Sequence, residues 1–177
     1  MKCQASALLC VIALLAFGVG DHAEGTMTNT TVYQIQQGNF TPGVDSVYVD
    51  SVLVTAVDRK TDTYGFHVQE LAGGPWSGIL CYLDIQYPTV NEGDLVTVWG
   101  QYDEYFDHSE IELVNANVVI IEPKYAEPAC TLLSCEDLSH FAEADSDWAE
   151  KWEGVFICVD TVQVGGHGPY GEWSVAE

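Results

Sequence analysis

Runs of alternating apolar and polar residues dominate the chain between residues 44 and 123. The runs are rich in β-branched and aromatic residues, and turn-forming residues separate them, which is typical of short antiparallel strands. Five such runs span residues 46–58, 63–71, 77–84, 93–106 and 109–122. Because the spacing is short and regular and the first and fourth runs are long, the pattern predicts a mainly β domain built as a five-stranded antiparallel barrel.

The pattern changes after Pro123. Residues 124–151 contain Ser134-x-x-Asp137, which is close to a helix capping box, followed by apolar residues at approximately helical spacing. The spacing predicts a short helical linker with an interruption near residues 145–147. Its aromatic residues are expected to pack in a core rather than to bind a ligand.

A short sequence repeat follows this linker. Asp50–Val54 (DSVLV) returns 110 residues later at residues 160–164 (DTVQV), and Tyr64-Gly65 returns 106 residues later as Tyr170-Gly171. The repeat predicts that residues 152–177 form a β-hairpin equivalent to the first two strands of the barrel. We therefore expect an incomplete second barrel unit, loosely held or docked on the first, in a chain that is a fragment of a larger protein.

The N-terminus has the features of a secretory signal. A lysine follows Met1, residues 7–17 are apolar but too few to span a bilayer, and Gly18-Val19-Gly20 offers a cleavage site. We expect residues 1–20 to be removed, although an uncleaved anchor is the alternative, and the protein to be secreted into an extracellular or periplasmic space. Residues 21–43 are polar and predict an exposed lead-in.

Three short motifs in the predicted barrel resemble a known family. Gly65-Phe66, Ser77-Gly78-Ile79 and Gly93-Asp94-Leu95-Val96 resemble the OB-fold, over about residues 44–123. More narrowly, they are similar to the secreted OB-like domains found beside lamin-tail domains and with bacterial extracellular endonuclease/exonuclease/phosphatase-type nucleases. The resemblance implies a fold rather than an activity, and no part of the chain resembles the catalytic part of such a nuclease.

The net charge narrows the choice of ligand. The chain has 27 acidic and 5 basic residues, which gives a formal charge of -22. Electrostatic binding to nucleic acid needs clustered lysine and arginine to replace the counterions of the phosphates. The composition therefore argues against nucleic acid as a partner and leaves a saccharide or a protein as the favoured ligand.

OB-folds commonly bind ligands on the face of their second and third strands. In this sequence that face is predicted to present His67, Gln69, Trp76, Leu80 and Tyr82. The alternative is that these side chains only cover the barrel.

Of the six cysteines, Cys81, Cys130, Cys135 and Cys158 lie beyond the predicted signal. An oxidising compartment permits a disulfide. Cys130 and Cys135 lie in one linker, which favours a local bridge between them, whereas Cys81 and Cys158 fit buried thiols within apolar strands. The spacing of the cysteines and histidines does not match a zinc site.

No catalytic motif is present in the sequence, and we expect neither enzymatic activity nor a cofactor. The acidic residues 103–112 lack the glycine-containing arrangement of a calcium loop and predict a solvated segment. The favoured function is a secreted, non-catalytic OB-fold accessory or binding module. The alternative is the substrate-binding front end of an extracellular nuclease whose catalytic domain lies elsewhere.

Overall fold

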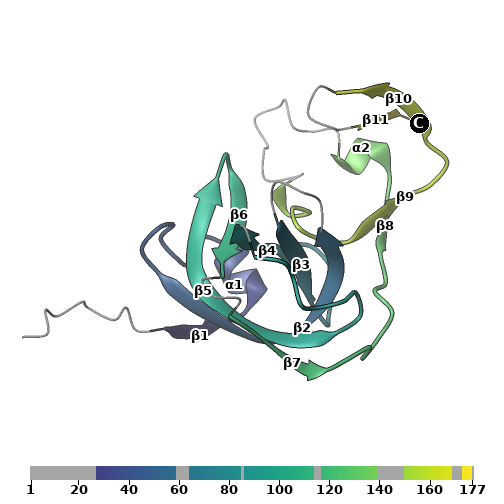
Figure 1. The fold of residues 1–177 in the computed structure, drawn as a ribbon. Coiled ribbons are helices and arrows are strands. Elements are labelled where there is room, and N and C mark those ends of the chain that lie inside the picture. Colours follow the sequence, from purple (N-terminus) through teal and green to yellow (C-terminus); the bar gives the residue numbers. More distant parts are fainter. Residues whose placement is uncertain are drawn as a thin grey trace, which may run out of the picture.

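The protein is mainly β in a computed structural model that describes residues 27–58, 64–84, 86–113, 117–138, 150–168 and 173–176. The predicted signal peptide lies outside these residues. Within them, no helix is long and apolar enough to cross a membrane. The first sheet forms a barrel, and two small sheets lie at its side (Figure 1).

Five strands close into the predicted barrel. They are β2 (Ser46–Asp58), β3 (Tyr64–Glu70), β4 (Gly78–Asp84), β5 (Leu95–Tyr105) and β6 (His108–Glu112). The hydrogen-bonded order is β2-β3-β4-β6-β5, and β5 pairs back onto β2. This ring confirms the OB-like barrel, with the difference that β4 and β6 are parallel while the other ring pairs are antiparallel.

Alternate residues of the ring strands fill the barrel interior, as the apolar alternation predicts. The residues with no exposed surface include Val47, Val49, Val52, Val54, Phe66, Val68, Ile79, Cys81, Val96, Val98 and Ile111. The buried thiol predicted at Cys81 is therefore confirmed. Burial raises the pKa of this thiol well above its usual value, so it remains protonated.

The fifth predicted strand is divided into two. β6 pairs with the second half of β5, and β7 (Val118–Glu122) pairs with the first half, with Val98 opposite Val118. Gly100 lies between these two pairings, where an added Cβ would come within 2.0 Å of the Glu112 carbonyl oxygen. The long strand β5 therefore pairs with two separate strands, β6 and β7. One continuous strand over residues 109–122 could not pair with both halves of β5 in this way.

The expectation of an exposed lead-in is wrong for residues 28–36. They form β1 (Thr28–Thr30), parallel to β2, and α1 (Val32–Gln36), which begins with a capping box at Thr31. Val32 and Ile35 have no exposed surface and belong to the barrel core. Five helical residues give too short a periodicity to distinguish this helix from a polar loop by sequence pattern.

The remaining elements form the two small sheets. β8 (Thr131–Leu133) pairs with β9 (Ile157–Val159), and β10 (Gln163–His167) pairs with β11 (Trp173–Ala176) as a hairpin. The predicted linker contains α2 (Cys135–Leu138), where the Asp137 backbone N–H donates to Ser134 Oγ at 3.2 Å. It also contains the strand β8, which was not predicted, and its apolar residues 141–149 lie outside the described part.

Candidate ligand-binding face

Neighbouring strands bring polar side chains from four elements into two rows on the outside of the barrel. In the first row, His67 on β3 is opposite Leu80 on β4, which is level with Glu110 on β6 and then Asp103 on β5. In the second row, Gly65 is followed by Tyr82, Glu112 and Gln101. The structure therefore brings together three of the five predicted binding residues, His67, Leu80 and Tyr82. We call these rows the acidic face.

The other two predicted residues contact a segment from the second half of the chain. Residues 150–156, called the strap, cross the end of β3 and the start of β4. The Trp76 backbone N–H donates to the Lys151 carbonyl at 2.6 Å, and the Phe156 backbone N–H donates to Gln69 Oε1 at 3.0 Å. Gln69 is buried, with 6% of its surface exposed. Within this chain its side chain holds the strap.

The strap also reaches β6 at the edge of the acidic face. The Ser109 backbone N–H donates to Glu153 Oε1 at 2.6 Å, and the same oxygen lies 3.6 Å from His108 Nε2. Burial raises the pKa of Glu153, and the nearby carboxylate of Glu150 acts in the same direction. The strap therefore adds a carboxyl group to one end of the face.

One carboxyl group within the two rows, that of Glu110, has a raised pKa. Burial raises the pKa of Glu110 to about 7, and the carboxylates of Glu112, Asp103 and Glu104 act in the same direction. The neighbouring imidazole responds oppositely, since burial lowers the pKa of His67 to about 4. Near neutral pH this part of the face thus carries neutral imidazole and partly protonated carboxyl, and it can both accept and donate hydrogen bonds.

A surface groove of about 300 Å³ opens beside the second row. It is lined by Tyr82, Leu83, Asp84, Gln86, Glu112 and Leu113. The Tyr82 hydroxyl donates to Asp84 Oδ1 at 3.3 Å, so a phenol and two carboxylates converge on the groove. A positively charged or hydrogen-bond-donating group suits these side chains.

The sequence did not place the acidic residues on the predicted binding face. Residues 103–112 were expected to be a solvated segment, yet Glu110 has only 6% of its surface exposed. The signal that could have located them is the alternation of Glu110 and Glu112 with buried Ser109, Ile111 and Leu113 along one strand. No group of His, Cys, Asp or Glu side chains in the described residues could hold a metal ion.

Among the described residues, the two rows of the acidic face contain no lysine or arginine. Of the five lysines and arginines, only Lys124 and Lys151 fall in the described part of the chain. The Lys151 ammonium lies over the ring of its neighbour Trp152, 5.8 Å from the ring centre. Arg59 and Lys60 lie outside the described residues.

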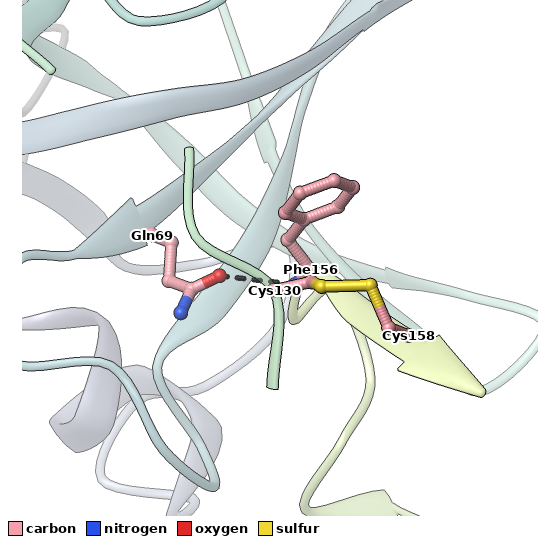
Figure 2. The surroundings of a disulfide bond; sticks show 4 residues. All are labelled: Gln69, Cys130, Phe156 and Cys158. Carbon is pink, nitrogen blue, oxygen red and sulfur yellow. Dashed lines mark hydrogen bonds between the residues drawn. A yellow bond between two sulfur atoms is a disulfide. The ribbon is translucent and has the colours of Figure 1, made fainter. Parts of the chain in front are cut away.

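The disulfide differs from the predicted one. Cys130 is bonded to Cys158, with 5.6 Å between their Cα atoms (Figure 2). Cys135 is not part of a disulfide. The parallel pairing of β8 with β9 places Leu132 opposite Cys158. Cys130, two positions before Leu132, is thereby brought close to Cys158. Cys135 instead begins α2. The local bridge to Cys135 and the buried thiol at Cys158 were therefore both wrong.

The disulfide lies beside the Gln69–Phe156 hydrogen bond, where the strap meets the barrel (Figure 2). It is consistent with an oxidising extracellular or periplasmic location.

Comparison with known proteins gives similarity of fold only. No family model matches the chain, and no curated protein sequence matches it. Among solved structures, a chain of a replication protein A heterotrimer bound to single-stranded DNA is 15% identical, with a TM-score of 0.41 over 52% of this chain and 82% of that chain. An aspartyl-tRNA synthetase from Leishmania major Friedlin is 10% identical, with a TM-score of 0.43 over 75% of this chain and 29% of that chain. The strand order of the ring itself carries the OB-fold assignment.

Proposed function

We propose that this chain is a secreted, non-catalytic OB-fold binding module whose acidic face binds a basic segment of a protein. OB-folds often bind nucleic acids. Here Asp103, Glu110 and Glu112 lie close to Tyr82 on that face, and this observation favours a basic protein segment over a nucleic acid.

The charge of the face decides between the ligand classes. A phosphate backbone brought against these carboxylates meets like charge, which the few basic residues of the chain do not offset. A lysine or arginine side chain meets opposite charge and an aromatic ring, and arginine can pair with a carboxylate through two hydrogen bonds. A basic protein segment therefore fits better than an oligonucleotide.

The partial burial of the face supports binding rather than simple solvation. Only 6% of the surface of Glu110 is exposed, so water solvates its ionised form poorly. A cation beside this carboxylate attracts its negative charge and offsets the lost hydration, so binding should stabilise the ionised form. Binding of a basic segment is thus expected to release a proton near neutral pH.

Fluorescence anisotropy at 0.15 M NaCl tests the proposal. We expect saturable binding of a labelled twelve-residue peptide rich in Arg and Lys, and no binding of single-stranded DNA of similar length. The double variant Glu110→Gln/Glu112→Gln should weaken peptide binding. A matched control, Glu122→Gln/Glu127→Gln, makes the same change in net charge at exposed positions away from the face and should bind normally.

An equal loss in the two double variants would show that the peptide responds only to net charge, and the site would be wrong. Binding of DNA that weakens with added salt would instead support the nucleic-acid front end of a nuclease. Binding of neutral oligosaccharides, abolished by Tyr82→Ala, would replace the protein ligand with a saccharide.

A further inference from the structure

The small sheets repeat the order of the first elements of the barrel. The barrel begins with strand β1, helix α1 and strand β2, and the second part begins with β8, α2 and β9. Both strand pairs are parallel and have the same register. Thr28↔Val47, Asn29↔Tyr48 and Thr30↔Val49 correspond to Thr131↔Ile157, Leu132↔Cys158 and Leu133↔Val159.

The two short helices begin in the same way. The Gln34 backbone N–H donates to Thr31 Oγ1 at 3.2 Å, and the Asp137 backbone N–H donates to Ser134 Oγ at 3.2 Å. Thr31 and Ser134 are each the residue after the parallel strand. Each helix therefore starts one residue beyond its cap, at the same distance from its strand.

The antiparallel pairs that follow also agree in register. Leu53↔Gln69, Val54↔Val68 and Val57↔Phe66 correspond to Gln163↔Ala176, Val164↔Val175 and His167↔Trp173. Both ladders contain an irregularity at the same place, after Val54 in the first and after Val164 in the second. A bulge is a specific local geometry, so its recurrence is a stronger match than the regular pairs.

An unusual backbone conformation recurs just before the bulge. Ser51 has a φ of 58° and Thr161 has a φ of 52°, both in the left-handed region that residues other than glycine rarely adopt. The two residues are 110 positions apart, as are the short sequences around them. The backbone therefore changes direction at the same residue in both places, within β2 in the barrel and between β9 and β10 in the second part.

The disulfide occupies a position that is filled differently in the barrel. By this register, Cys130 and Cys158 correspond to Met27 and Tyr48, which together line one small surface hollow. The second part thus has a covalent bond where the barrel has a methionine and a tyrosine lining a hollow.

The second part differs from the barrel at one edge. In the barrel, the edge of β2 opposite β3 is paired with β5, with Val49 opposite Val98 and Val52 opposite Val96. Among the described residues, no strand pairs with the matching edge of β9 and β10, since the sheets β8-β9 and β10-β11 have two strands each.

The apolar residues that match the barrel interior are less buried in this second part, with Ile157, Val159 and Val162 half-buried and Val164 exposed. Val54 has no exposed surface, whereas the matching Val164 has 59% of its surface exposed. An unpaired edge next to an open apolar side is a ready acceptor for another strand.

We propose that the described residues between Cys130 and Ala176 are a second copy of the first half of the barrel, and that the edge formed by Ile157–Val159 and residues 162–163 binds an added antiparallel strand with the pattern of β5. The occupant is a strand with valine-like residues opposite Val159 and Val162 and a small residue opposite Ile157. These are the positions of Val98, Val96 and Gly100 relative to β2. The proposal is independent of the acidic face.

A synthetic peptide of residues 93–102 is the probe, added to the chain that starts at residue 21. Amide hydrogen exchange of residues 157–163 should slow markedly when the peptide binds. Two N-methylated peptides, each blocking alternate amides, provide the control. Only the set that faces the edge should abolish protection, because the other set points away from the pairing.

Substitution of the acceptor gives a second measurement. Val162→Lys should weaken peptide binding by about tenfold or more, because a charge then lies under the added strand. Val44→Lys, at a residue with 67% of its surface exposed, is the matched control and should bind as the unmodified chain does.

Three results would overturn the proposal. These are binding that leaves exchange at residues 157–163 unchanged, equal effects of the two N-methylated peptides, and protection of this edge by association of the chain with itself, detected by sedimentation without peptide.

Discussion

Gly78 and Gly154 are in direct backbone contact, although 76 positions separate them in the sequence. A Cβ added to Gly78 would lie 2.1 Å from the Gly154 carbonyl oxygen, and a Cβ added to Gly154 would lie 2.8 Å from the Gly78 carbonyl carbon. The strap can therefore lie flat on the start of β4 only because neither residue has a side chain.

The first prediction follows from this contact. Gly78→Ala should displace the strap, since backbone cannot yield as a flexible side chain can. We expect faster amide exchange at Ser109 and Phe156, whose N–H groups are bonded to Glu153 and Gln69 in this arrangement. Gly166→Ala, where an added Cβ meets nothing within 4 Å, is the control. Unchanged exchange in Gly78→Ala would show that the strap does not rest on β4.

The second prediction concerns the disulfide. Cys130→Ser/Cys158→Ser opens a bridge with a sequence separation of 28 residues. A loop of this length is worth about 3–4 kcal/mol in the chain-entropy treatment. We expect exchange protection in β8 and β9 to be lost while the barrel strands keep theirs. Cys135→Ser, which replaces a cysteine outside the disulfide, should change neither. Loss of protection throughout the barrel would show that the two parts unfold together.

The third prediction concerns α1. Ile35→Ala should lower the free energy of unfolding of the barrel by about 2–5 kcal/mol, because it leaves a cavity among fully buried side chains. Urea unfolding followed by circular dichroism measures the change. Gln37→Ala, at an exposed residue of the same segment, should have a small effect. Similar stabilities of the two variants would show that residues 28–36 are an exposed lead-in and not part of the barrel core.

The fourth prediction concerns pH. The pKa of Glu110 rises from about 4.5 to about 7 on folding, so between these pH values the native state holds a proton that the unfolded state has released. This contribution to stability therefore falls as pH rises through that window. Glu110→Gln removes it, and the variant should be more stable than the unmodified chain at pH 8 by about 1–2 kcal/mol after screening.

Near pH 4.5 the two proteins should be equally stable, as measured by urea unfolding. The opposing effect of His67, whose pKa is lowered to about 4, is present in both proteins and cancels in the difference. A constant difference between pH 4.5 and pH 8 would assign the effect to packing rather than to ionisation.

The fifth prediction concerns salt. A formal charge of -22 makes the compact state repel itself, and added ions screen this repulsion. The melting temperature should therefore rise between low and near-molar NaCl. The rise should be smaller near pH 4.5, where many carboxylates are protonated. A flat response at pH 8 would show that the acidic side chains are too widely separated to repel one another.

The sequence by itself determined the barrel, because each ring strand carries its own apolar alternation. Residues 46–58 were predicted with the bounds of β2, and the valines at alternate positions became its buried face. The hairpin of β10 and β11 was predicted in the same local way, from the repeat of the residues around Val54 and Gly65. These features need only short-range information, namely strand periodicity and turn residues.

Only the tertiary structure decided which distant segments meet. The pairing of β8 with β9 selected Cys158 rather than Cys135 as the partner of Cys130, and spacing along the chain could not show this. Gln69 and the Trp76 backbone, predicted on the binding face, instead form hydrogen bonds with the strap. The pairing of β5 with β6 places Asp103 and Glu110 on that face. Hydrophobic periodicity predicts which face of a strand is buried. Strand order and register determine which residues of neighbouring strands lie beside its exposed face.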